Sequence, residues 1–128
     1  MTDPIATAAD FVRVLQAEVQ RHLAAAQLTL PRYAVLHRAA GASAADVAAL
    51  MGVSPQMVSK TVGQLVLLDY VTSVPADDRR RQLLQLTAMG ARALTLARAI
   101  DLPPALVTAM TSYVASTPQS NHVDQPVA

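Results

Sequence analysis

The segment ADDRRRQLLQLT joins two acids and three consecutive arginines to a short apolar alternation. Arg79, Arg80 and Arg81 carry the planar cation that is best suited to the narrow, strongly negative minor groove of A·T-rich DNA. Asp77 and Asp78 can each hold a guanidinium in one orientation through a bidentate hydrogen bond. A run of arginines by itself is more often a solvated surface, so the surrounding elements decide its meaning.

A second set of polar side chains lies on the segment SPQMVSKTVGQL. If Val58, Thr61, Val62 and Leu65 turn inward, the helix presents an outward face that contains no acid. Glutamine can read adenine in the major groove, serine can bind a base or a phosphate, lysine can neutralise a phosphate, and methionine can touch the methyl group of thymine. We therefore predict that DNA is contacted by Ser54, Gln56, Met57, Ser59, Lys60, Gln64, Arg79, Arg80 and Arg81, with Asp77 and Asp78 positioning the arginines.

No other grouping of residues suits catalysis or metal binding. His22, His37 and His122 show no metal-ligand spacing, and the chain has no cysteine. The sequence contains no glycine-rich phosphate loop, no nucleophile elbow and no pair of catalytic carboxylates without arginine partners. We expect neither an enzyme nor a bound metal or cofactor.

Composition indicates one mainly helical domain. The chain has 128 residues, which is enough to bury a real core. Hydrophobic residues make up 52% and aromatic residues only 3%, and the resulting richness in alanine and leucine favours helices. The amino terminus lacks the features of a signal peptide, and no apolar run is long enough to span a membrane. We expect a soluble protein of the cytoplasm.

Helix start and stop signals divide the chain into elements. Gly41 and Gly52 can end the second and third helices, because glycine adopts the left-handed conformation of a helix stop. The segments YVTSVP and RQLLQLT read as the strands of a hairpin with the arginines at its tip and on its return strand. Residues suited to begin a helix are Asp3, Thr29, Ser43 with Asp46 three residues later, Ser54 with Pro55, and Thr87.

The third and fourth predicted helices are joined by only a few residues. A helix-turn-helix requires a small residue at the crossing, a glycine in the turn and a β-branched anchor in the second helix, and Ala48, Gly52 and Val58 supply these. A hairpin after the second helix can reach the neighbouring minor groove. The predicted fold class is mainly α with a small β-hairpin wing, a winged helix-turn-helix. The predicted single domain spans 1–128, with a core over 28–87, a connecting helix over 87–101, terminal helices over 4–26 and 103–116 and a disordered tail over 117–128.

These segments resemble the multiple-antibiotic-resistance regulator (MarR) family of winged helix-turn-helix repressors. The resemblance covers 28–94, and its most specific part is matched by Asp78, Arg80, Leu86, Thr87 and Gly90. It implies a homodimer assembled by the terminal helices, whose unpartnered apolar stripes also predict an interface. It further implies binding of double-stranded DNA at a pseudo-palindromic operator, and release by a small, often aromatic, anionic ligand.

The ligand implied by the resemblance would lie between the dimer helices and the DNA-binding lobe. We expect Arg13, Tyr33 and His37 to converge there. One departure from the family pattern is Asp69, which stands where glycine usually precedes the first wing strand; aspartate tolerates a positive φ better than most residues, so the turn can form.

Two other functions remain open at this point. A winged domain can serve as a protein-interaction module that does not bind DNA, and the formal net charge of only +1 favours this alternative. A ligand sensor without DNA contact is the weaker third hypothesis. Against both, local potential rather than total charge governs the encounter with DNA.

Overall fold

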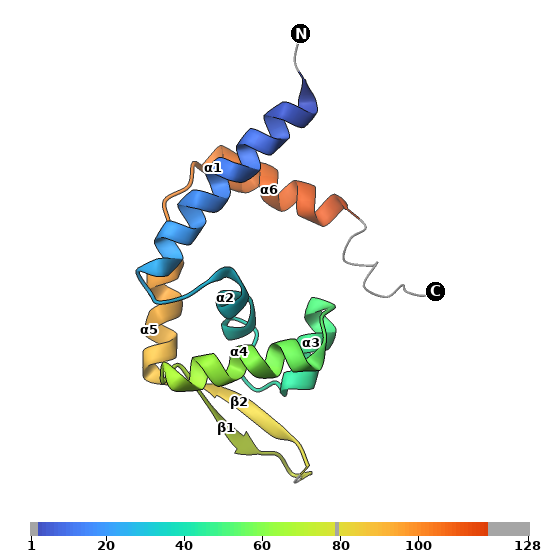
Figure 1. Ribbon diagram of the computed structural model, residues 1–128, viewed down its shortest axis with the longest axis vertical. Helices are drawn as coiled ribbons and strands as arrows, with labels where there is room; N and C mark the ends of the chain where they lie inside the picture. Colours follow the sequence, from blue (N-terminus) through green and yellow to red (C-terminus); the bar gives the residue numbers. More distant parts are fainter. Residues whose placement is uncertain (1–2, 79, 118–128) are drawn as a thin grey trace, which may run out of the picture.

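The computed structural model describes residues 3–78 and 80–117. It is mainly helical, with one antiparallel hairpin (Figure 1). The predicted fold class, a winged helix-turn-helix, is confirmed. The elements are α1 (Pro4–Ala24), α2 (Leu30–Leu36), α3 (Ala44–Met51), α4 (Pro55–Leu67), β1 (Val71–Pro75), β2 (Gln82–Leu86), α5 (Ala88–Ala97) and α6 (Pro104–Ser116).

Local capping explains where most of these helices begin. The Ser43 hydroxyl accepts a hydrogen bond from the Asp46 N–H at 3.1 Å, and the Asp46 carboxylate accepts one from the Ser43 N–H at 3.1 Å, which is the predicted capping box. The side chains of Asp3, Thr29, Ser54 and Thr87 also accept backbone N–H groups of the helices that they precede. The predicted helix starts are therefore confirmed.

The second helix is shorter than predicted, because it ends at Leu36 rather than at Gly41. The Gly41 N–H donates to the Leu84 carbonyl at 2.8 Å, and the Leu84 N–H donates to the Ala42 carbonyl at 2.7 Å. The chain around Gly41 thus lies along the outer edge of β2. Its backbone N–H and carbonyl groups bond to Leu84 there, so they are not available to continue the helix. Gly41 does adopt the expected positive φ, 78°, but within this turn.

The core lies in the lobe formed by α2 to α5 and the hairpin. Its largest fully buried side chains come from four different elements, α2, α3, α4 and β1. The helix-turn-helix and the wing therefore share one hydrophobic core. Asp69 has φ of 63°, so the turn before β1 forms as predicted. The largest fully buried side chains are those of Val35, Leu36, Val47, Val58, Leu65 and Val71.

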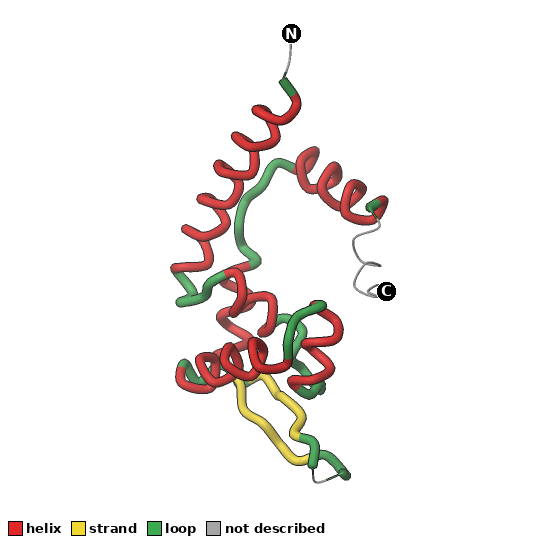
Figure 2. Tube along the Cα trace, turned by 45° about the vertical axis from the view of Figure 1, so that its right-hand side comes forward, coloured by secondary structure: helices red, strands yellow, loops and turns green. Residues whose placement is uncertain are grey.

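The terminal helices extend beyond the lobe on the side opposite the wing (Figures 1 and 2). Helix α6 contains no buried residue. Its Val107 and Tyr113 are exposed, as are Ile5, Val12 and Val14 of α1. Within residues 3–78 and 80–117, no helix has both the length and the apolarity needed to cross a membrane.

Candidate nucleic-acid interface

Helix α4 presents the predicted outward face. The Ser54 hydroxyl accepts the Met57 N–H at 3.1 Å and fixes the helix start. Val58, Thr61 and Leu65 are buried beneath the helix. Because a helix repeats every 3.6 residues, burial of these three turns the intervening side chains to solvent. The exposed residues include Gln56, Met57, Ser59 and Lys60, as predicted for a face that meets DNA.

Gln64, the last predicted contact on this helix, is partly buried and has a partner from another helix. Its side-chain oxygen, Oε1, accepts a hydrogen bond from Arg32 Nε of α2 at 3.1 Å. Arg32 Nη1 also donates to the Gln27 carbonyl at 3.2 Å, in the loop after α1. Sequence reasoning missed Arg32, and no local pattern could have found it because it is 32 positions from Gln64.

A hollow of about 390 Å³ lies where α2 meets α4. Two cations, Arg32 and Lys60, contribute to its wall, and neither forms an ion pair with any residue that the structure describes. The structure therefore adds a second positive charge beside the lysine of the α4 face. The hollow is lined by Thr29, Pro31, Arg32, Met57, Lys60, Thr61 and Gln64.

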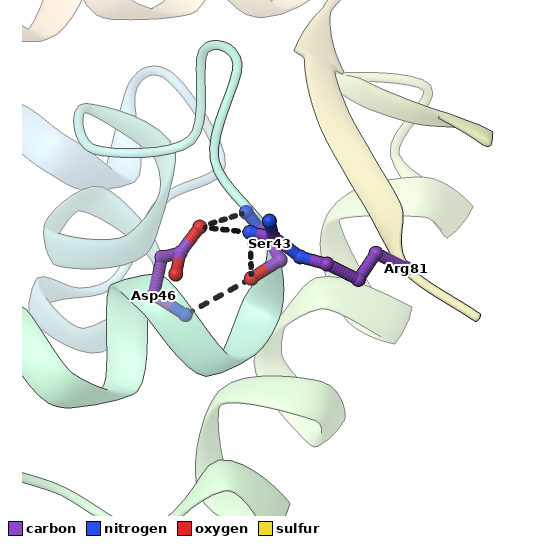
Figure 3. A network of polar contacts seen from close by, with 3 residues as sticks. All are labelled: Ser43, Asp46 and Arg81. Atoms are coloured by element: carbon purple, nitrogen blue, oxygen red, sulfur yellow. Dashed lines mark hydrogen bonds and ion pairs between the residues drawn. The ribbon is translucent and has the colours of Figure 1, made fainter. Parts of the chain in front are cut away.

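In the wing, β1 and β2 pair antiparallel with Val71 opposite Leu86. Arg81, predicted to contact DNA, lies at the start of the return strand and reaches α3. Its Nη2 lies 2.8 Å from Asp46 Oδ2 and 3.5 Å from Ser43 Oγ (Figure 3). This ion pair ties the wing to the capping box of α3, so Arg81 braces the hairpin rather than extending freely from it.

The same contacts change the acidity of Asp46. Hydrogen bonds from the Ser43 N–H and hydroxyl, and then the positive charge of Arg81, hold the pKa of the Asp46 carboxyl below its usual value. The carboxylate therefore stays ionised to a lower pH than an ordinary aspartate.

The wing acid Asp78 contacts backbone N–H groups in the described part of the chain, whereas the sequence-based prediction is that it holds a guanidinium. Asp78 Oδ1 accepts the backbone N–H of Arg80 at 3.1 Å, and the Asp78 carbonyl accepts the Arg81 N–H at 2.8 Å. Asp78 thus shapes the turn through the backbone, because a short side chain next in sequence can close a turn on nearby N–H groups. Neither Asp77 nor Asp78 forms an ion pair with Arg80 or Arg81.

Arg80 is an unpaired cation in the described part of the wing. Its side chain is exposed and makes no hydrogen bond or ion pair with any residue in 3–78 or 80–117. It lies in the segment between β1 and β2, and the hairpin extends from the lobe on the side opposite α1 and α6 (Figure 1). Arg79, which is also predicted to contact DNA, lies outside the described residues.

The three residues predicted for an effector site do not converge. Tyr33 and His37 stack with ring centroids 5.3 Å apart, but Arg13 pairs with Asp10 on α1 at 3.3 Å. Arg13 precedes the buried Leu23 by ten residues, and at 1.5 Å per residue this places it about 15 Å further along the helix. Within one copy of the chain, Arg13 therefore lies away from Tyr33 and His37, and its part in an effector site stays a prediction.

Tyr33 instead lines a hollow of about 320 Å³ between α1, α2 and the end of α5. The Tyr33 hydroxyl accepts a hydrogen bond from Arg98 Nε at 3.1 Å. Sequence reasoning missed Arg98, which lies 65 positions away. Burial and the charges of Arg38 and Arg98 lower the pKa of His37. The hollow is lined by Val19, His22, Leu23, Leu30, Tyr33, Ala97, Arg98, Ile100 and Leu102.

Comparison with known proteins shows which family part of this chain resembles. A sequence model described as the MarR family matches residues 34–82. A search among curated proteins finds no match.

Solved structures of MarR-family regulators share the fold. A MarR-family transcriptional regulator from Rhodococcus sp. RHA1 is 24% identical, with a TM-score of 0.69 over 84% of this chain and 86% of that one. CouR from Rhodococcus jostii RHA1, bound to p-coumaroyl-CoA, is 21% identical, with a TM-score of 0.69 over 98% and 95%. A mutant MarR from E. coli, complexed with operator DNA, is 17% identical, with a TM-score of 0.67 over 88% and 91%. Residues 34–82 thus carry the MarR-family sequence, and the chain around them has the fold of MarR-family transcriptional regulators, as the resemblance predicted.

Proposed function

We propose that the chain is a transcriptional regulator that binds operator DNA with α4 in the major groove and the wing in the minor groove. The observation that carries the proposal is the exposed face of α4, which combines Gln56, Ser59 and Lys60 without a single acid. Lysine supplies phosphate binding, while the neutral polar side chains can read base edges. The free side chain of Arg80 at the tip of the wing suits an A·T-rich minor groove.

The alternative is a protein-interaction module, which the net charge of +1 favours. The distribution of charge argues against it. Arg32 of α2, Lys60 of α4 and Arg80 of the wing have no acidic partner among the described residues, and Arg32 and Lys60 line the same hollow. A locally positive surface attracts DNA even when the total charge is small.

Gel shifts decide between these functions. Genomic fragments from upstream of the gene would be tested with the full chain at two salt concentrations. Regulation predicts a retarded complex on particular fragments that weakens as salt rises, because bound phosphates release counterions on complex formation. If no fragment is bound at either salt concentration, the DNA-binding proposal fails and the protein-interaction function becomes the better one.

We further propose that two copies of the chain assemble through α1 and α6. Both helices extend from the lobe with exposed apolar side chains, and exposed apolar faces of this kind normally mark interfaces. A symmetric dimer would present two α4 helices to two half-sites of a pseudo-palindromic operator. Analytical ultracentrifugation tests this proposal, and a monomer at micromolar concentration would refute it.

We also propose that the protein is a repressor released by an aromatic anion in the hollow lined by Tyr33 and Arg98. The wall is largely apolar, which suits an aromatic ring, and the Arg98 guanidinium, placed by its bond to Tyr33, suits a carboxylate. CouR, a relative in fold, is bound to p-coumaroyl-CoA, which contains an aromatic group. Calorimetry with salicylate-like acids should show binding that Arg98→Met abolishes; absence of binding to the unaltered chain would refute this pocket.

A further inference from the structure

We infer that Arg32 is a positioning residue that fixes the amide of Gln64, and thereby sets which base Gln64 reads. The inference rests on the proposed DNA-binding function, which it deepens by naming a determinant of sequence preference. It starts from the contact between α2 and α4, in which Arg32 Nε donates to Gln64 Oε1 at 3.1 Å.

The chemistry of arginine decides the orientation of this amide. A guanidinium has hydrogen-bond donors and no acceptor, so the glutamine atom that faces it must be the carbonyl oxygen. The oxygen and the nitrogen of a planar amide point in different directions, so the NH₂ group of Gln64 is turned away from Arg32. Without such a partner, the two ends of the amide could exchange places with little cost.

Arg32 is itself held in place from a third element. Its Nη1 donates to the Gln27 carbonyl at 3.2 Å, and Gln27 has a positive φ of 58° in the loop between α1 and α2. The guanidinium is therefore anchored at one side by the loop and at the other by α4. A side chain with two anchors loses little further freedom when DNA arrives, so it can hold Gln64 in one orientation.

The NH₂ group of Gln64 is available to a ligand. It makes no hydrogen bond with any residue in the described ranges, and Gln64 shares the hollow with Lys60 and Met57 of the DNA-facing surface. The group offers two donors. In the major groove, guanine presents two neighbouring acceptors, N7 and O6, whereas adenine presents an acceptor beside a donor. The geometry therefore favours guanine at the base opposite Gln64, in contrast to the adenine contact suggested by residue type alone.

Selection from a randomised duplex library tests the inference. The unaltered chain and Gln64→Ala are compared first, because the base positions whose preference changes are those read by Gln64. At these positions, Arg32→Lys should retain guanine, since lysine also has only donors. Arg32→Gln should relax the preference, since its amide can face Gln64 with either end.

Arg32→Glu provides the sharpest variant. Glutamate has only acceptors when ionised, so it would turn the Gln64 NH₂ inward and present Oε1 to the DNA. Preference at the same positions should move from guanine toward bases with a donor in the major groove, adenine or cytosine. The added negative charge lowers affinity for all sequences, which changes total binding and not the relative base frequencies. Circular dichroism and urea unfolding confirm that each variant is folded.

The possible outcomes separate the two proposals. If the unaltered chain enriches no sequence, the DNA-binding function fails and this inference fails with it. If the chain enriches a site but every Arg32 variant keeps the same base frequencies, Arg32 acts only as a phosphate contact or a structural residue, and the inference alone is overturned. An unchanged site for Gln64→Ala overturns it as well.

Discussion

Gly90 of α5 lies so close to the backbone of Tyr70 that we predict a loss of stability when it is replaced by alanine. A Cβ at this position would lie 2.0 Å from the Tyr70 carbonyl oxygen and 2.9 Å from the Tyr70 carbonyl carbon. Comfortable contact requires about 3.5 Å, so the backbones of α5 and Tyr70 must separate by more than 1 Å, on the order of one bond length. Neither is free to move, because Tyr70 is buried and its hydroxyl donates to the Ala26 carbonyl at 2.7 Å.

The expected cost of Gly90→Ala combines three effects. Overpacking a tight contact costs about 1–3 kcal/mol, and disturbance of the bond from the Thr87 N–H to the Tyr70 carbonyl, 3.1 Å long, adds about 1 kcal/mol. The higher helix propensity of alanine offsets about 0.5–1 kcal/mol of this destabilisation. We expect a net loss of about 1–3.5 kcal/mol in the free energy of unfolding, which is a large share of the roughly 5–15 kcal/mol typical of a domain.

Gly63 supplies the matched control, because it is also a helical glycine but a Cβ there has nothing within 4 Å. Gly63→Ala should stabilise the fold by about 0.5–1 kcal/mol. Urea unfolding followed by circular dichroism, at one protein concentration, measures both variants. The steric reasoning is refuted if Gly90→Ala unfolds within about 0.5 kcal/mol of the unaltered chain, the ordinary range of a harmless substitution.

Three further predictions concern the interface, the wing brace and the assembly. Arg80→Ala should lower the slope of log affinity against log salt by about 0.9 for each phosphate that the wing no longer neutralises, whereas Gln56→Ala should change base preference and leave that slope unaltered. Fluorescence anisotropy at several salt concentrations measures both slopes. Equal slopes for the two variants would show that the wing does not contact DNA. Since the folded pKa of Asp46 is lowered, its stabilising contribution is present above the unfolded pKa and lost as pH falls through the lower folded value. Urea midpoints below about pH 4 should thus fall more steeply for the unaltered chain than for Asp46→Asn, and parallel curves would contradict the assignment. Val12→Glu places a charge on the exposed apolar face of α1 and should shift the chain toward monomer in ultracentrifugation without changing its circular dichroism; an unaltered dimer would exclude this face from the interface.

Sequence reasoning succeeded where the interactions are local. The capping box of Ser43 and Asp46 joins residues three positions apart, so its pattern is visible in the sequence and defines the start of α3. The same holds for the turn at Asp69, whose positive φ depends on that residue's own tolerance. The outward face of α4 also follows from periodicity alone.

Sequence reasoning failed where a partner comes from a distant segment. The end of α2 depends on backbone bonds between the chain near Gly41 and Leu84, which propensity does not contain. The sequence gives no sign that Arg81 pairs with Asp46, because that partner lies 35 positions away; the DNA contact of Arg81 stays a prediction. It gives no sign of Arg98 either, because the partner of that arginine, Tyr33, is 65 positions away. Each of these pairs forms only after the elements pack, so neither residue carries a local signal of the other.

The two hydrogen bonds that Leu84 makes with Gly41 and Ala42 also protect the hairpin from unwanted pairing. A strand at the edge of a sheet offers unpaired N–H and C=O groups, which can recruit a strand of another molecule. Here the outward backbone groups of Leu84 are already occupied within the chain. The opposite strand ends in Pro75, which has no N–H to offer. The outer edge of β2 is therefore blocked at Leu84 and the end of β1 at Pro75, two positions at which a strand of another copy would otherwise find backbone groups to pair with.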